Sequence, residues 1–204
     1  MKNKKVMIIG SLIFIIIILI LYYKNQNLGN NTNRSIKNLK DYILNISSYE
    51  ATVEVNIISN KNTNKYILKQ WYASPNIFKQ EVQSPDNIKG LTIIYDGMNL
   101  KLQNTRLNLV KVYNGYSELS ENILSLNGFI DKCKNLEVIC NETQEEIELQ
   151  ITEVDKYTKY QILTINKKTG IPVKMEIMDE NKKTLVYILY NEITINNTTK
   201  EDII

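Results

Sequence analysis

Histidine is absent from this sequence of 204 residues. Without it, the chain cannot build a Ser-His-Asp or Cys-His nucleophile, and it lacks the commonest side-chain ligand of zinc. Only two cysteines are present, too few for a four-cysteine metal site. Enzymes that rely on carboxylates alone need no histidine, but no paired-acid motif stands out in the sequence. We therefore expect a protein without catalytic residues, bound metal or cofactor.

A strong basic charge is also lacking once the N-terminal segment is set aside. The chain carries 25 basic and 22 acidic side chains, but four of the basic residues and none of the acidic ones lie within the first 24 positions. The remainder has 21 basic and 22 acidic residues, a net charge of −1. Nucleic-acid binding needs a concentrated basic face, so the composition indicates no nucleic acid as a partner.

One long apolar run is present, near the N-terminus. Residues 6–23 carry no charge and follow Lys2, Lys4 and Lys5. As a helix this run would be about 27 Å long, close to the ~30 Å hydrocarbon core of a bilayer. The lysines predict a single-pass membrane anchor over residues 1–24, with a cytoplasmic N-terminus and an exported remainder. A cleaved signal peptide and a buried core helix stay open as alternatives, although no small-residue cleavage motif follows the run.

Three segments are expected after the anchor. Residues 25–33 are polar and rich in asparagine, which predicts a flexible tether. Residues 34–196 predict one exported domain, long enough to bury a substantial core. Residues 197–204 show no packing pattern and predict a disordered tail.

Two amphipathic helices are expected in the domain. The first begins near residue 33 and ends near residue 47, and its apolar residues share one face at spacings of three and four: Ile36, Leu39, Ile43 and Ile46. The second begins at Ser117 or Ser120 and ends near Lys132, with an equivalent face of Leu119, Ile123, Leu126 and Ile130.

Strand patterns account for the rest of the domain. Apolar and polar residues alternate through residues 49–57, which is typical of a strand with one buried face. Further strands are expected at 65–73, 76–83, 91–95, 99–103, 107–113, 136–140, 145–154, 158–166, 171–178 and 184–195. Turns as short as those between them join antiparallel neighbours, and so large a sheet must curl and bury one face. The predicted fold class is therefore mainly β, an antiparallel meander of about eleven strands covered by two helices.

The order of several short motifs resembles a known family. Tyr49-x-Ala51 is followed by Trp71-x-x-x-Pro75, by Gly90 with Ile94-Tyr95-Asp96-Gly97, and by Ile165-x-x-x-Thr169-Gly170-Ile171-Pro172. This order is similar to that of the LolA/LolB-like lipoprotein carriers, and among them to the clostridial germination lipoproteins of the GerS type. The resemblance covers roughly residues 35–196 and contains no catalytic motif.

The resemblance implies an unclosed antiparallel β-barrel of about eleven strands with helices in its mouth. In the carriers the hollow takes up acyl chains, and an arginine in the strand after the proline helps to latch the helices; Lys79 stands nearest to that position. GerS-like proteins are implied to be partners of CwlD-like N-acetylmuramoyl-L-alanine amidases, which are needed for modification of the spore cortex. GerS carries a lipidation cysteine that this sequence lacks, and a membrane-spanning anchor would provide the same tethering.

Four residues are candidate contacts for a ligand or partner: Trp71, Tyr72, Lys79 and Tyr95. Because Trp71 and Tyr72 are adjacent on a predicted strand, they are expected to face opposite sides of the sheet.

A turn and a cysteine pair complete the candidates. Asp96 and Gly97 are expected to form a tight turn rather than an acidic site. Cys133 and Cys140 lie in the predicted exported part, where oxidising surroundings permit a disulfide. The sequence leaves a disulfide and two free thiols open.

The sequence predicts a protein that acts by binding. The first hypothesis is a membrane-tethered, non-catalytic accessory of a CwlD-like amidase in cortex modification and germination. The second is a carrier or sensor of lipids or lipoproteins, with an acyl chain in the hollow, and the third is a carboxylate-based cell-wall hydrolase. Through its open strand edges, the domain is expected to form a homodimer or a complex with the amidase. An apolar hollow would favour the carrier, whereas a filled hollow with an exposed strand edge would favour a protein partner.

Overall fold

The computed structural model describes residues 36–116, 124–152 and 158–203. The predicted anchor and tether lie outside these ranges. Within the described ranges, no helix combines the length and the apolar character needed to cross a membrane.

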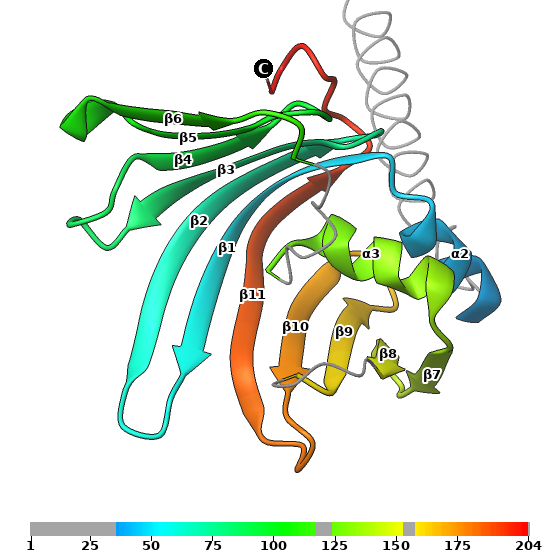
Figure 1. Cartoon of the computed structure of the whole chain (residues 1–204). Helices are drawn as coiled ribbons and strands as arrows, with labels where there is room; N and C mark the ends of the chain where they lie inside the picture. The colour runs from blue at the N-terminus through cyan, green and yellow to red at the C-terminus, as the bar shows by residue number, and fades with distance from the viewer. Residues whose placement is uncertain (1–35, 117–123, 153–157, 204) are drawn as a thin grey trace, which may run out of the picture. The chain divides into compact units, whose positions relative to one another are not determined.

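The described chain forms one antiparallel sheet with two α-helices on its concave side (Figure 1). The first half of the sheet contains β1 (Ser48–Ile58), β2 (Thr63–Ala73), β3 (Ile77–Ser84), β4 (Leu91–Tyr95), β5 (Leu100–Asn104) and β6 (Leu109–Tyr113). The second half contains β7 (Val138–Glu142), β8 (Glu146–Thr152), β9 (Tyr160–Asn166), β10 (Pro172–Met178) and β11 (Thr184–Ile195). The α-helices are α2 (Ile36–Leu44) and α3 (Leu126–Asn135), and a short 3-10 helix, η1 (Thr105–Leu107), joins β5 to β6. The eleven predicted strands are confirmed.

The strand order explains why the barrel stays open. It runs β6-β5-β4-β3-β2-β1-β11-β10-β9-β8-β7, so the first and last strands of the chain pair at the centre. β6 and β7 lie at opposite ends of this order and form the two edges. The predicted unclosed antiparallel sheet is therefore confirmed.

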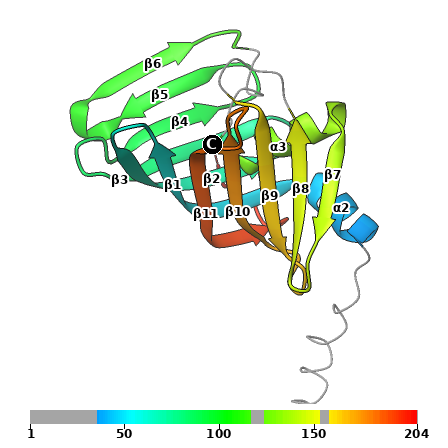
Figure 2. The same cartoon turned by 90° about the horizontal axis from the view of Figure 1, so that it is seen from below.

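Alternating side chains of the strands build the core on the concave face. In β1, Tyr49, Ala51, Val53 and Val55 are buried, whereas Glu50, Thr52 and Glu54, which alternate with them, are half-buried on the other face. Helix α3 packs on this core from the concave side. Its Phe129 side chain is buried, and its Asn127 Oδ1 accepts a hydrogen bond of 3.0 Å from the Tyr49 hydroxyl. Figure 2 shows both helices beside the β7–β9 half, while β4, β5 and β6 extend away from them.

The described residues of the predicted apolar faces are buried in both helices, but the ends of the helices differ from the predicted ones. Leu39 and Ile43 of α2 are fully buried, and the helix ends at Leu44, before the predicted residue 47. The second helix ends later than predicted, because α3 continues past Lys132 to Asn135. Its described part begins at Leu126, with Ser125 as the N-cap. Its predicted N-terminal part over residues 117–123 lies outside the described residues.

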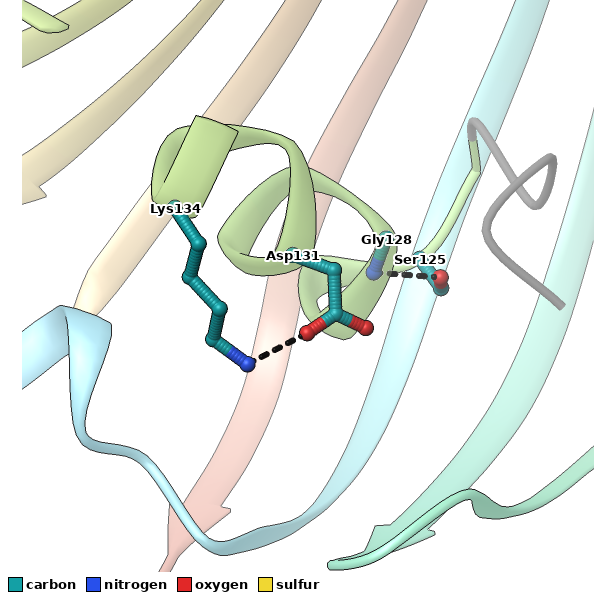
Figure 3. Close-up of polar contacts among 4 residues, drawn as sticks. All are labelled: Ser125, Gly128, Asp131 and Lys134. Carbon is teal, nitrogen blue, oxygen red and sulfur yellow. Dashed lines mark hydrogen bonds and ion pairs between the residues drawn. The ribbon is translucent and has the colours of Figure 1, made fainter. Parts of the chain in front are cut away.

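A serine cap and an ion pair stabilise α3, as Figure 3 shows. The Ser125 side chain accepts a hydrogen bond from the Gly128 N–H at 3.1 Å, which satisfies one of the free N–H groups of the first turn. Lys134 Nζ lies 2.6 Å from Asp131 Oδ1, one turn apart on the exposed side of the helix.

The prediction of a disordered tail does not fit residues 197–203. Asn196 Oδ1 accepts hydrogen bonds from the Ser47 backbone N–H and hydroxyl, and the Thr198 N–H donates to Ser48 Oγ. Ile203 is then buried against Ala73 and Ile77. Polar contacts and one apolar side chain hold the segment in place, and neither gives a periodic pattern in a sequence.

The Asp96-Gly97 segment is a turn, as predicted. Asp96 Oδ1 accepts hydrogen bonds from the backbone N–H groups of Met98 and Asn99 at 2.9 and 2.7 Å. These bonds hold the pKa of the Asp96 carboxyl below its ordinary value. Gly97 has φ of +96°, a conformation that favours glycine.

Cys133 and Cys140 are both free thiols, which is one of the two alternatives that the sequence left open. Cys133 belongs to the buried core cluster beneath α3, and Cys140 of β7 packs half-buried against that cluster. Burial raises the pKa of the Cys133 thiol to about 12, so that this side chain stays protonated and behaves as a small apolar group.

Candidate partner-binding surface at the β6 edge

Strand β6 is exposed along its whole length. All five of its residues are classed as exposed, and its sequence is Leu-Val-Lys-Val-Tyr. The exposed fractions of Leu109, Val110 and Val112 are 59%, 64% and 50%. Monomeric proteins usually blunt edge strands with charges, proline or a covering element, because an edge offers unpaired backbone groups to other chains. β6 thus combines an open edge with apolar side chains on both of its faces.

The turn before β6 fixes the hairpin that presents this edge. Asn104 Oδ1 accepts hydrogen bonds from the N–H groups of Arg106 and Leu107 at 3.1 and 3.2 Å, which caps η1. Asn108 then reverses the chain with φ of +50°, a conformation that asparagine tolerates better than most residues. Leu109 returns opposite Asn104 and begins the pairing of β6 with β5.

An apolar groove lies beside this edge, with a volume of about 480 Å³. Its apolar lining comes from three strands and two connecting segments: Ile88, Leu91, Leu102, Leu107, Leu109 and Val110. Leu91 and Leu109 are both paired with Asn104, so they share its face of the sheet, the face on which Tyr95 is buried. The groove therefore continues the concave apolar face beyond the part that α2 and α3 cover.

The charges around the groove are mainly basic. Lys111 of β6 lines it, and Lys89 and Arg106 line a smaller hollow beside it together with one acidic residue, Asp86. Arg106 Nη1 donates a hydrogen bond to the backbone carbonyl of Asp86 at 3.1 Å. A carbonyl carries no net charge, so this contact does not neutralise the guanidinium group. The groove thus offers apolar walls and a cationic rim.

The opposite edge, β7, is better protected. Val138 and Cys140 are half-buried, and the strand ends in Asn141 and Glu142, which are polar. Ile139 is its one large apolar side chain with high exposure among the described residues of the strand, at 46%. The two edges therefore differ, and β6 is the one suited to association.

Two of the predicted site residues lie in the core instead of on a surface. Tyr72 is 7% exposed, with its ring centroid 5.7 Å from that of Tyr49. Tyr95 is 3% exposed and its hydroxyl donates to the Gly97 carbonyl at 3.1 Å. Both positions contribute to packing, and Tyr95 also secures the turn that follows it.

The other two predicted residues meet on the outer face. Lys79 is paired with Trp71 across β2 and β3, and its Nζ lies 5.0 Å from the centroid of the Trp71 ring. Lys69 Nζ lies 4.9 Å from the same ring and also pairs with Glu50 at 2.8 Å. Because the neighbouring Phe78 is buried on the concave side, Lys79 points away from the helices and does not correspond to a latch. The four predicted residues are therefore not brought together in one site.

The β6 edge was missed at the level of sequence, although a signal was present. Leu109, Val110, Val112 and Tyr113 are apolar at both odd and even positions, so the strand cannot hide them by alternation. Such a strand is either buried on both faces or exposed on at least one of them. The fold places β6 at the edge of the sheet, and its side chains are therefore exposed.

Solved structures resemble this chain in fold. An uncharacterized conserved protein from Thermus thermophilus has a TM-score of 0.53 at 12% identity, with 83% of this chain and 93% of that chain covered. A LolA superfamily protein from Nitrosomonas europaea has a TM-score of 0.46 at 11% identity, with coverages of 84% and 98%. The complex of the CwlD amidase from Clostridioides difficile with the GerS lipoprotein contains a chain with a TM-score of 0.44 at 22% identity, with coverages of 82% and 96%. The LolA superfamily and GerS, to which the sequence was likened, are thus among its structural neighbours.

Sequence comparisons give a family but no curated relative. No curated protein matches the chain. Among the described residues, no group of three or more cysteine, aspartate or glutamate side chains is placed to hold a metal ion. A family model described as sporulation protein YdcC-like matches residues 3–204, nearly the whole sequence. The chain therefore belongs to the YdcC-like family of sporulation proteins.

Proposed function

We propose that this sporulation protein is a membrane-tethered, non-catalytic accessory that binds a protein partner along β6, and that the partner is a CwlD-like amidase of the spore cortex. The observation that carries the proposal is the mostly apolar edge strand, which is exposed along its whole length. An extended segment of a partner can add to such an edge, where main-chain hydrogen bonds supply affinity and neighbouring pockets supply specificity.

The groove beside β6 supports a partner of this kind. Its volume of about 480 Å³ falls in the range of sites that accept a ligand or a buried side chain. It opens next to Leu109 and Val110, so one side chain of an added strand would reach it. The choice of an amidase rests on the resemblance of the sequence to GerS-like proteins and on the sporulation family.

The test is complex formation between the full-length chain in lipid nanodiscs and the cognate amidase. We expect the two to co-elute in size-exclusion chromatography with the summed mass by light scattering. A double variant, Val110→Asp with Val112→Asp, should lose the complex. Docking of an apolar strand would strip the two carboxylates of their hydration, which is costly. Both positions are exposed, so the core is not disturbed. Ile139→Asp on β7 is the matched control and should retain it.

Two results would count against this proposal. If the wild-type chain and the amidase elute separately, the amidase is not the partner. If the complex survives the double substitution in β6, docking uses another surface.

The location at a membrane is part of the proposal and is supported by the sequence of the N-terminal segment. The uncharged run over residues 6–23 follows three lysines, which favours an anchor with an exported C-terminal part. Protease added to intact protoplasts is expected to digest the domain and leave a short membrane fragment. Full protection of the chain would contradict the orientation, and a mature form that begins after Tyr23 would contradict the anchor.

A lipid carrier or sensor is the second candidate, and the same groove favours it. Its lining is mostly apolar, which suits an acyl chain. However, the centre of the concave face is filled by side chains such as Tyr49, Phe129 and Leu149, which are each at most 1% exposed. The carrier would be favoured if the chain bound a fluorescent fatty acid stoichiometrically and did not bind the amidase.

A further inference from the structure

The β5–β6 hairpin carries basic side chains and lacks acidic ones. Its two strands contain Lys101 and Lys111, and η1 between them contains Arg106. Lys111 Nζ lies 4.8 Å from the ring centroid of Tyr113, so the ammonium group stands over an exposed aromatic ring of its own strand. The edge therefore presents a positive charge at the middle of an apolar strand.

Carboxylates nearby do not neutralise these lysines. The Asp96 carboxylate is engaged by the N–H groups of Met98 and Asn99 and by the Asn99 side chain. Among the ion pairs of the described residues, none involves Lys101 or Lys111. A partner that approaches β6 therefore meets cations that are available for pairing.

From these features we infer that the occupant of β6 is an extended segment with an acidic residue at its centre and apolar residues on both sides of it. The inference rests on the proposed docking at β6 and specifies its chemistry. In the register of the sheet, Leu109, Lys111 and Tyr113 share the concave face, while Val110 and Val112 share the other. A strand added beside β6 places its central side chain opposite Lys111, where a carboxylate pairs favourably, and its other side chains opposite apolar residues.

A second copy of the chain is a poorer occupant. An antiparallel pair of two β6 strands in full register would place Lys111 directly opposite Lys111, and Leu109 opposite Tyr113. Like charges directly opposite each other destabilise a strand pair. A shift by two residues avoids this contact but leaves fewer of the five residues paired. The charge of the edge thus favours an acidic partner strand over self-association.

The test uses two fluorescein-labelled, end-capped peptides, Ser-Ile-Val-Glu-Val-Tyr-Ser and the same sequence with lysine in place of glutamate. Fluorescence anisotropy with the full-length chain in nanodiscs is expected to show about tenfold tighter binding of the glutamate peptide. Lys111→Glu should reverse this preference, and Lys111→Arg should keep it. Lys168→Glu, an exposed site in the turn between β9 and β10, should change nothing. Hydrogen exchange should show added protection of the backbone amides of residues 109–113 when the glutamate peptide binds.

Three outcomes would overturn the inference: equal affinity for both peptides, a preference that Lys111→Glu leaves unchanged, or a dimer of the full chain that the double substitution at Val110 and Val112 dissolves. Its failure can be told apart from failure of the proposed function. If the amidase binds and needs Val110 and Val112 but tolerates Lys111→Glu, docking at β6 stands and the acidic chemistry is wrong. If the peptide preference is found and the amidase does not bind, the chemistry stands and the partner is a different protein.

Discussion

Replacement of Val53 by aspartate is expected to abolish folding of the domain. Val53 lies in the centre of β1, between Leu68 of β2 and Tyr190 of β11, and its side chain is fully buried. A carboxylate at this point has no cationic neighbour on the concave face of these three strands, and its burial costs several kcal/mol. The free energy of unfolding of a typical domain is about 5–15 kcal/mol, so one such substitution removes much or all of it. Circular dichroism of the full-length variant should show no cooperative unfolding transition.

The adjacent residue provides the matched control. Thr52 lies on the other face of β1, half-buried, between Lys69 of β2 and Glu192 of β11. Thr52→Asp is expected to change the free energy of unfolding by less than about 1 kcal/mol, as is usual for substitutions outside the core. Equal loss of stability in both variants would mean that the faces of β1 are assigned wrongly. From strand alternation alone, Ile93→Asp is expected to be as destabilising as Val53→Asp. In the structure Ile93 is only half-buried, at the open end of the concave face, so Ile93→Asp should lower the free energy of unfolding by less.

The sequence predicted the strands well because each one carries its own signal. The alternation in residues 49–57 marks β1, and the turn residues around Asp96 and Gly97 mark the β4–β5 hairpin. Pairing of β1 with β11 joins segments at opposite ends of the domain, so no local pattern encodes it. That pairing became predictable only through the resemblance to an unclosed barrel.

The site was predicted less well because exposure is a property of the whole fold. Tyr95 was a candidate contact on its chemistry, yet the concave curve of the sheet buries it, while Lys79 falls on the outer face. Val110 and Val112 have the composition of a core strand and are exposed only because β6 has no neighbour on one side. A sequence shows which side chains are apolar, but the number of neighbours that a strand acquires depends on where the sheet ends.

Alkaline pH is expected to destabilise the domain strongly, mainly through three buried acids. Burial raises the pKa of the Tyr49 and Tyr190 hydroxyls above the ordinary value of 10.0, and it raises the pKa of the Cys133 thiol from 9.0 to about 12. Above pH 9 the unfolded chain releases the Cys133 proton and the folded chain keeps it; above pH 10 the same holds for the tyrosines. The folded state then binds more protons, so stability falls as pH rises, by up to about 1.4 kcal/mol per pH unit for each group. Urea unfolding between pH 8 and 11 at constant ionic strength should show a decline that begins near pH 9 and steepens above pH 10.

Two tyrosine-to-phenylalanine variants separate this titration from ordinary packing. The buried Tyr190 hydroxyl has no hydrogen-bond partner among the described residues, so Tyr190→Phe should leave the free energy of unfolding at pH 7 within about 0.5 kcal/mol of wild type. Above pH 10 it should flatten the decline by up to about 1.4 kcal/mol per pH unit, since one of the three acids is gone. Tyr49→Phe should flatten the decline as well, but at pH 7 it should cost about 1–3 kcal/mol, because it leaves the buried Asn127 Oδ1 without its donor. If both variants keep the wild-type slope above pH 10, these phenols are not the groups that couple folding of the domain to alkaline pH.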